Sequence, residues 1–315
     1  MIIDVHAHYH PRAYLEALSK AMGREIGPFA PHPDTDDAAH VETRLRQMDE
    51  AGVGLQVLSP AAGRAPYGKD EALSVAAARL CNDQHAELVA KHPDRFKAYV
   101  TLPLPHVEAS LAELRRAMAL PGMIGLNLHI SAQDRSVAED EFLPVYEEMN
   151  RRRGVIFYHP CGNSIGSPMI ADYGFGGAVG TSLEDAAIVC HLIAKKIPSK
   201  YPEIKFIVPH LGGPVAMLLQ RLDNQFSMRS RELPEPPSVT ARRLYYDTVG
   251  HGSHAALTCA CMAYGADHVL VGSDFPVLHS WETYDRTINW PRGVQLPAGE
   301  VEQVMEKTAS RVLGL

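Results

Sequence analysis

The sequence predicts a single (β/α)8 barrel domain that spans residues 1–315. Short apolar segments alternate eight times with longer amphipathic segments, which is the order expected of strands and helices in this barrel. Several apolar segments are continuous, as is typical of strands buried on both faces of a parallel sheet. An open doubly wound sheet is the alternative, but no G-x-G-x-x-G motif follows the first strand. No linker or repeat divides the chain.

Each predicted strand is a short apolar run that precedes a predicted helix. The strands are expected at 2–6, 53–58, 96–102, 123–128, 155–158, 205–208, 244–249 and 269–272. The runs Val-Ile-Phe-Tyr, Phe-Ile-Val and Val-Leu-Val begin or fill three of them, and such β-branched and aromatic runs favour buried strands.

The helices are predicted from apolar residues spaced three or four positions apart. They are expected at 37–51, 70–91, 106–118, 139–151, 181–197, 214–229, 253–264 and 299–313. In the first of them Val41, Leu45 and Met48 form the apolar face, and Gly52 ends the helix. A proline-rich loop that includes Pro28 precedes this helix, and the glycine-rich stretch 162–180 is interpreted as a mobile lid after the fifth strand.

Composition excludes several classes of function. The 315 residues are 46% hydrophobic with a net charge of −7 and a pI of about 6.1, which disfavours binding to nucleic acid or to an acidic membrane surface. The five cysteines are scattered and lack C-x-x-C spacing, so we expect reduced thiols in a cytoplasmic protein. No secretory signal is expected, and no apolar run approaches the roughly 20 residues of a membrane span.

Side chains suited to metal binding or acid–base chemistry follow four of the eight predicted strands, the first, fifth, sixth and eighth. His6 and His8 end the first strand two positions apart, so they share one face. His159 ends the fifth strand and Asp274 follows the eighth. Barrel closure brings the carboxyl ends of the strands toward one axis, where the chemistry of this fold takes place. Three imidazoles and one carboxylate fit a catalytic zinc site and are compatible with manganese or iron.

One metal ion is expected rather than two. The fourth strand ends in Gly-Leu-Asn-Leu followed by His129, so no lysine is available there to bridge a second ion. His210 follows the sixth strand, within the same predicted ring of strand ends. Because imidazole titrates near neutral pH, His210 is the candidate for proton transfer, with Asp274 as a second candidate.

The sequence resembles the amidohydrolase superfamily, in the branch that contains aminocarboxymuconate-semialdehyde decarboxylase and related aromatic-acid decarboxylases. The matching motifs are D-V-H-A-H at 4–8, R-L-R-Q-M-D-E-A-G-V at 44–53, H-P-D-R-F at 92–96, F-L-P-V-Y at 142–146, H-P at 159–160, P-H-L-G-G at 209–213, F-S-M-R at 226–229 and G-S-D-F-P at 272–276. The resemblance implies that His6, His8, His159 and Asp274 bind the metal. It also implies that His210 acts as general acid/base beside metal-bound water.

The resemblance further implies a homodimer. Arg229 matches an arginine that reaches into the partner subunit and binds a substrate carboxylate. Fifteen helical residues separate it from Pro214, which places it about 22 Å from the start of its helix, too far to reach its own metal. The alternative is an arginine that stabilises its own helix end.

Two departures from that decarboxylase argue against its own substrate. The segment 31–37 contains no arginine where the decarboxylase has a second carboxylate-binding arginine, and Cys161 replaces a tryptophan. His129, His251 and Cys161 lie at strand ends and are predicted to contact substrate, although structural roles remain open for each. His10 is interpreted as a pocket or solvent histidine.

The predicted function is non-oxidative decarboxylation of an aromatic or unsaturated carboxylic acid, a small-molecule substrate. Hydrolysis of an amide, ester, lactone or C–C bond is the alternative, because the same five residues would serve it, and hydration of a dicarboxylate is a third reading. An inert barrel with a structural metal would leave His210 without a role.

Overall fold

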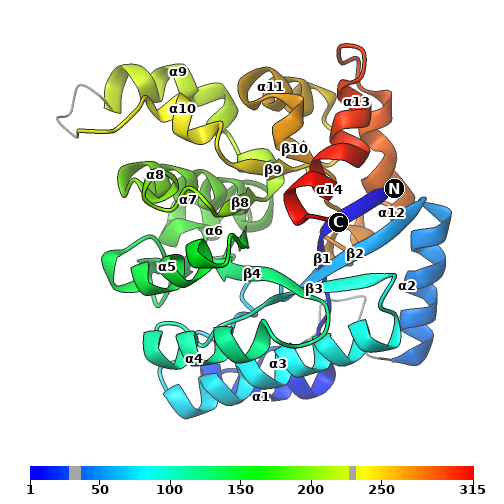
Figure 1. Cartoon of the computed structure of the whole chain (residues 1–315), viewed down its shortest axis with the longest axis vertical. Helices are drawn as coiled ribbons and strands as arrows, with labels where there is room; N and C mark the ends of the chain where they lie inside the picture. Colours follow the sequence, from blue (N-terminus) through cyan, green and yellow to red (C-terminus); the bar gives the residue numbers. More distant parts are fainter. Residues whose placement is uncertain (28–36, 227–231) are drawn as a thin grey trace.

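The computed structural model describes residues 1–27, 37–226 and 232–315, and these ranges form a parallel barrel (Figure 1). Within them the main sheet has eight strands in the order β1-β2-β3-β4-β7-β8-β9-β10, and every recorded pair is parallel. The strands are β1 Ile2–His8, β2 Val53–Ser59, β3 Phe96–Val100, β4 Met123–His129, β7 Val155–His159, β8 Lys205–Val208, β9 Tyr245–Asp247 and β10 Val269–Leu270. The predicted (β/α)8 fold is therefore confirmed.

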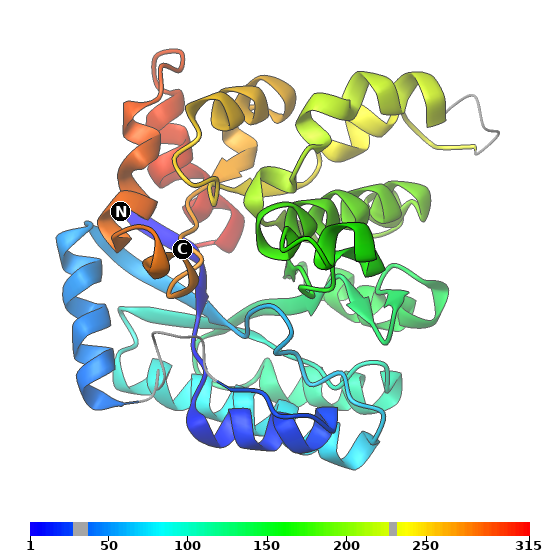
Figure 2. The same ribbon diagram turned by 180° about the vertical axis from the view of Figure 1, so that it is seen from behind.

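The barrel closes between its first and last strands. The amide of Val5 donates to the carbonyl of Val271 at 3.0 Å, and that of His8 donates to Phe275 at 2.7 Å. The amino group of Met1 pairs with Glu306 at 3.0 Å, so both termini lie at one side of the barrel (Figure 2). Residues more than 260 positions apart thus become neighbours.

Helices surround the sheet. The longer ones are α1 Arg12–Met22, α2 Ala38–Glu50, α3 Glu71–Lys91, α4 Val107–Ala117, α5 Leu143–Arg151, α7 Thr181–Ala194, α9 Val215–Phe226 and α11 His254–Tyr264. The shorter ones are α6 Pro168–Ala171, α8 Ile197–Lys200, α10 Pro237–Ala241, α12 Tyr284–Asn289, α13 Glu300–Glu302 and α14 Thr308–Leu313. The predicted helix at 299–313 is divided into α13, a π-helical segment and α14.

The first connection differs from the sequence prediction, because α1 occupies part of the expected loop. Its residues Tyr14, Leu15 and Leu18 are buried and pack in one apolar cluster with Cys81 of α3. Gly23 ends the helix with a φ of 63°, a conformation that suits glycine. The helix has no acidic residue in its first turn and no side-chain cap, so the start signals on which sequence prediction relies are missing.

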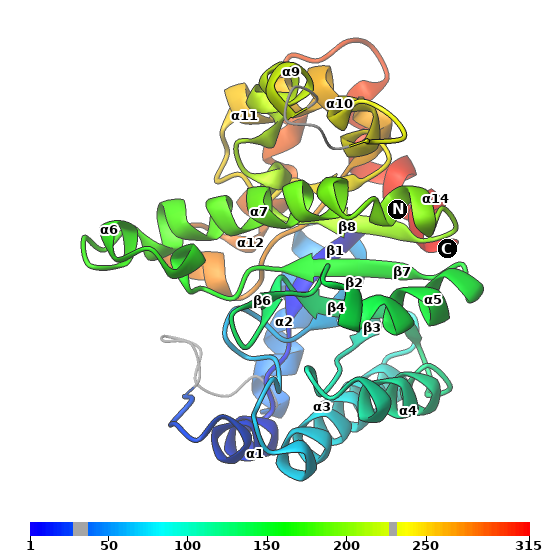
Figure 3. The ribbon, with the colours of Figure 1, turned by 90° about the vertical axis from the view of Figure 1, so that its left-hand side faces the viewer.

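The glycine-rich segment after β7 contains short helical turns and α6, which projects from the barrel (Figure 3). Met169 and Tyr173 on this projection are 83% and 76% exposed. The stretch Gly176–Ala194 that follows is apolar and long enough to cross a membrane, with a mean hydropathy of 1.2. That finding corrects the expectation that no run approaches this length. It is weak evidence for a membrane span, because the core helices of globular proteins meet the same criterion.

Candidate metal centre

The four predicted ligands converge at the carboxyl ends of β1, β7 and β10. Their ligand atoms all lie within 4.8 Å of one another, and all four side chains are buried. His8 Nε2 lies 3.1 Å from His6 Nε2 and 2.8 Å from Asp274 Oδ1. Tetrahedral zinc at 2.0–2.1 Å from two nitrogens would hold them roughly 3.3 Å apart. The spacing therefore fits the ligand shell of one ion.

The outer nitrogens of the three imidazoles donate hydrogen bonds that fix the ring tautomers. His6 Nδ1 donates to Asp247 Oδ2 at 2.7 Å, and His8 Nδ1 lies 3.2 Å from the carbonyl oxygen of Ser59. His159 Nδ1 lies 2.9 Å from the carbonyl oxygen of Pro160. With the protons on Nδ1, each Nε2 has a lone pair for a metal. The buried Nε2 of His159 has no hydrogen-bond partner among the described residues, as fits a metal ligand.

Burial and charge favour the ligand forms of His8, His159 and Asp274, whereas at His6 the charges of Asp247 and Asp274 outweigh burial and raise the pKa to about 9. Burial lowers the pKa of His8 to about 4. Burial also lowers the pKa of His159 well below its ordinary value. Burial would raise the pKa of Asp274, but the charge of His6 and hydrogen bonds outweigh it and hold that pKa well below its usual range. Neutral imidazoles and an ionised carboxylate are the species that bind a divalent cation.

Asp247 supports both the metal site and the proton-transfer site. One oxygen accepts the His6 ring hydrogen bond, and the other accepts from the backbone amides of His210 at 2.8 Å and Val249 at 3.0 Å. Gly272 lies directly behind it, since a Cβ there would come within 2.9 Å of the Cβ atoms of both Asp247 and His6. The chain after β10 can pass this close to Asp247 and His6 only because residue 272 has no side chain.

His210 faces the ligand cluster from the end of β8. Its Nδ1 donates to Asp185 Oδ2 at 2.8 Å, and its Nε2 lies 3.9 Å from Asp274 Oδ2. Burial alone would lower the pKa of His210, but the charges of Asp185 and Asp274 outweigh it and raise that pKa well above its ordinary value. His210 and Asp274 both have positive φ angles, 53° and 54°. Non-glycine residues rarely adopt this conformation, and such strained residues cluster at functional sites.

A cavity of about 700 Å³ contains two of the predicted substrate contacts, His129 and Cys161, in its lining. The His129 ring lies 5.4 Å from that of His159, so this end of the cavity adjoins the metal centre. His129 is 2% exposed, and its Nε2 has no hydrogen-bond partner within the described ranges. Cys161 Sγ lies 3.2 Å from Ser131 Oγ.

The other predicted contacts lie elsewhere. His251 follows β9 with its side chain 56% exposed, and its Nδ1 is 3.9 Å from Glu282. Arg229 lies outside the described residues, as does nearly all of the segment 31–37. His10 is 2% exposed and accepts a hydrogen bond from the amide of Ala61 at 3.0 Å, so the solvent reading of this residue is wrong.

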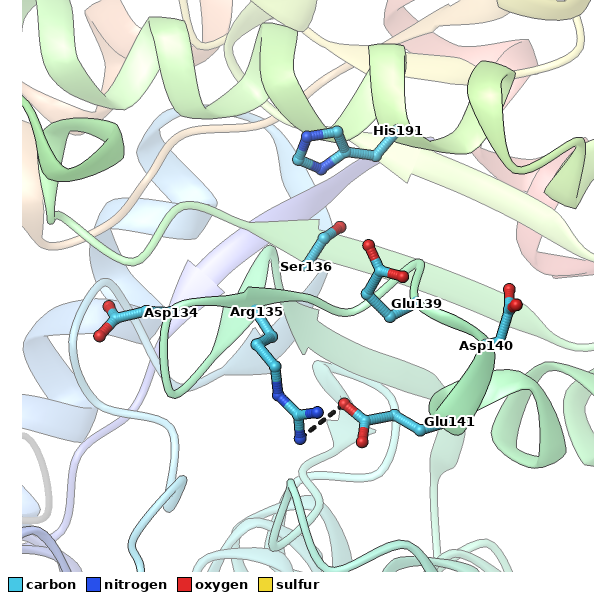
Figure 4. Close-up of a pocket in the computed structure, with 7 residues that line it drawn as sticks. All are labelled: Asp134, Arg135, Ser136, Glu139, Asp140, Glu141 and His191. Atoms are coloured by element: carbon cyan, nitrogen blue, oxygen red, sulfur yellow. Dashed lines mark ion pairs between the residues drawn. The ribbon is translucent and has the colours of Figure 1, made fainter. Parts of the chain in front are cut away.

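A second cavity, of about 500 Å³, lies beside the hairpin formed by β5 Ser131–Ala132 and β6 Arg135–Ser136 (Figure 4). Its charged residues come from segment 134–141, with His191 of α7 opposite. Arg135 pairs with Glu141 at 2.7 Å, and Lys195 pairs with Glu139 at the same distance. None of the four predicted metal ligands lines either cavity, but His129 of the first cavity lies against the predicted ligand His159, so we place the candidate active site beside the first one.

Comparison with known proteins agrees with this geometry. The family model named Amidohydrolase matches residues 3–315. The chain belongs to the amidohydrolase family. It is 23% identical over 269 residues to 2-amino-3-carboxymuconate-6-semialdehyde decarboxylase of Dictyostelium discoideum, covering 84% of this chain and 71% of that protein. It is 28% identical over 280 residues to 6-methylsalicylic acid decarboxylase of Penicillium expansum, covering 87% and 84%.

A solved structure of an amidohydrolase-like decarboxylase superimposes over the whole chain. Dihydroxybenzoic acid decarboxylase from Polaromonas sp. JS666, with bound manganese and 2-nitroresorcinol, gives a TM-score of 0.82 at 22% identity and covers 100% of this chain and 97% of the other. At this identity the likeness establishes the fold. The resemblance stated from the sequence motifs is thus confirmed at the level of the family and of its decarboxylase branch.

Sequence reasoning missed the carboxylates around this amidohydrolase site. Asp185 lies in the first part of α7, and Glu184 beside it accepts the backbone amides of Gly162 and Ser164 at 3.1 and 2.8 Å. Asp247 and Asp4 lie within otherwise apolar strands, where a charged residue is unusual and signals a buried partner. Asp4 accepts from the amide of Ser273 at 3.0 Å, which attaches the segment carrying Asp274 to β1.

Proposed function

We propose that this amidohydrolase catalyses the metal-dependent, non-oxidative decarboxylation of an aromatic or unsaturated carboxylic acid. The observation that carries the proposal is the position of His210, a proton donor held by Asp185, with its Nε2 3.9 Å from the free oxygen of the ligand Asp274. Four ligands would suffice for a structural ion, whereas an additional oriented imidazole at the same point supports catalysis. The decarboxylases among its relatives support the same reaction class.

His6, His8, His159 and Asp274 would hold the ion, which supplies Lewis-acid stabilisation of the substrate carboxylate and an adjacent oxygen. Asp185 accepts a hydrogen bond from His210 Nδ1, and its charge helps to raise the pKa of His210 so that the ring keeps a second proton on Nε2. His210 then donates that proton to the carbon bearing the carboxylate. The bond between this carbon and the carboxylate breaks, its electron pair returns to the carbon skeleton, and carbon dioxide leaves. Asp274 is placed to receive or return a proton at its second oxygen.

His129 and Cys161 are our proposed substrate contacts, because they line the cavity beside the metal ligands. The unpartnered Nε2 of His129 is suited to a polar group of the substrate. His251 stays a prediction with less support, since half of its side chain faces solvent.

Zinc is the proposed resident metal, because three imidazoles and one carboxylate suit it. Manganese is the second choice and is the ion bound in the related dihydroxybenzoic acid decarboxylase. Metal analysis of protein purified without added metal, followed by reloading of the chelated protein with each ion, distinguishes the two.

Hydrolysis is the second proposed activity, since the same residues could direct water at an ester or lactone. The deciding experiment incubates the metal-loaded protein with hydroxybenzoates, muconates, lactones and esters and follows carbon dioxide and acid production separately. Carbon dioxide without net hydrolysis supports decarboxylation. Acid from a neutral ester or lactone, with no carbon dioxide from any carboxylate, refutes it in favour of hydrolysis.

We also propose a homodimer in the cytoplasm, with Arg229 of one subunit in the site of the other. The exposed apolar side chains of the projecting segment, among them Met169 and Tyr173, support an interface. The five cysteines are all free thiols, which agrees with a reducing compartment. Sedimentation analysis of the purified protein measures the assembly size.

A further inference from the structure

The cavity beside the metal centre has several cations in its lining. Lys20, Arg24 and Lys69 line it together with His129 and Cys161. Lys20 and Arg24 lie at and just after the end of α1, and Lys69 directly precedes α3, so two separate chain segments supply the charges. This local excess of positive charge contrasts with the net charge of −7 of the whole chain.

These three cations are exposed and form no ion pair within the described ranges of the chain. Two carboxylates line the same cavity, Asp70 and Asp134. Asp70 is engaged as the cap of α3, where it accepts the amide of Leu73 at 3.0 Å. The cations are therefore incompletely balanced by the described residues that line the cavity.

A fourth cation lies beside the cavity wall. Arg64 donates to the carbonyl oxygens of Ala62 and Gly27 at 3.0 and 2.9 Å, which anchors its guanidinium. Burial lowers the pKa of Arg64 to about 10, and the charge of neighbouring Arg24 lowers it further in the same direction. Like charges held this close favour an anion between or beside them.

The lining also includes the apolar or aromatic side chains of Ala65, Tyr67 and Leu73. The cavity thus combines exposed cations and apolar side chains with the buried His129, whose Nε2 is unpartnered and whose ring lies 5.4 Å from that of the predicted ligand His159. A molecule complementary to these surfaces has an apolar body, one acidic group for the metal centre and a second one for the cations.

We propose that the substrate carries a second acidic group, remote from the carboxylate that is removed, and that Lys20, Arg24 and Lys69 bind it. This inference rests on the proposed decarboxylase function, because that function places the reacting carboxylate at the metal. It assigns the recognition of the second anion to residues of the same chain, at the end of α1 and the start of α3.

The test uses two probes that differ in one charge: 4-hydroxyisophthalate, which is salicylate with a second carboxylate, and its methyl ester at that second carboxylate. Binding of each to the zinc-loaded protein is measured by calorimetry, and carbon dioxide release is measured separately. We expect the diacid to bind about tenfold more tightly than the ester at low salt, and the preference to shrink as salt screens the exposed charges.

The Arg24→Glu/Lys69→Glu double variant should reduce this preference to about twofold or less, with the same metal content as the parent protein. Lys205→Glu, which reverses an exposed charge at the first residue of β8, is the matched control and should keep the preference. Equal binding of the two probes by the parent protein, or an equal loss in the control, overturns the inference. Binding of the diacid without carbon dioxide release from any acid would instead refute the decarboxylase function and leave the anion site in place.

Discussion

The replacement of Asp247 by asparagine tests how one buried carboxylate serves two sites. Asp247 accepts three hydrogen bonds, from His6 Nδ1 and from the amides of His210 and Val249. Asparagine keeps the shape but offers only one oxygen. If that oxygen faces the two amides, the NH2 group faces His6 Nδ1 and forces the ring proton onto Nε2, where the metal needs a lone pair.

The opposite orientation leaves two buried amide donors without an acceptor, at about 1–3 kcal/mol each. The first orientation costs less free energy, so we expect the substitution to weaken metal binding rather than to destabilise the fold. Loss of such an outer hydrogen bond typically weakens metal affinity about 10–100-fold, which corresponds to about 1.4–2.7 kcal/mol. We therefore expect Asp247→Asn to weaken zinc binding by this factor, while the metal-free protein unfolds at nearly the parent temperature.

Competition with a chromophoric chelator measures the zinc affinity, and thermal unfolding of the chelated protein measures stability. Asp185→Asn is the matched control, because Asp185 contacts His210 and none of the four ligands is its recorded hydrogen-bond partner. It should keep the zinc affinity within about threefold and lower kcat by about 100-fold or more. The reasoning is refuted if both variants have the parent affinity, or if Asp185→Asn loses zinc as strongly as Asp247→Asn.

Three further predictions follow from the same geometry. His210→Gln should retain the metal and lose about 100-fold or more in kcat, measured by carbon dioxide release at full metal loading; unchanged turnover would remove His210 from the reaction. Mixing inactive Arg229→Ala and His210→Gln proteins should restore up to about a quarter of parental activity if each dimer site uses both chains, and no recovery would exclude a role in trans. Burial lowers the pKa of His85 to about 4 in the folded protein, whereas the same imidazole has a pKa near 6.5 in the unfolded chain. The unfolded state therefore binds a proton at this residue first as the pH falls, and the stability of the fold decreases. Between pH 7.5 and 5.0 the unfolding free energy should therefore fall by about 2 kcal/mol less in His85→Gln than in the parent protein, as measured by urea titration. An equal fall in both proteins contradicts a lowered pKa of His85.

The local pattern of the chain determined the barrel and indicated the candidate ligands. All eight expected strands end within two residues of the observed strand ends, because continuous apolar runs reflect burial on both faces. The ligands were predictable because alternation along β1 places His6 and His8 on one face, and because all strands of a parallel barrel end at the same side.

Only the tertiary structure could decide how those ligands are held. Asp247 lies 241 positions from His6, and Asp185 lies 25 positions from His210 in a different element. Neither pair has a periodic spacing, since each contact arises where a crossover helix or a distant strand packs against the barrel. The cations that line the cavity could not be predicted either, because α1 has no start signal in the sequence and its end meets Lys69 at this cavity only after folding. The sequence by itself thus indicated which residues could bind a metal, while packing between distant segments decided which side chains orient these candidate ligands, hold His210 and line the cavity.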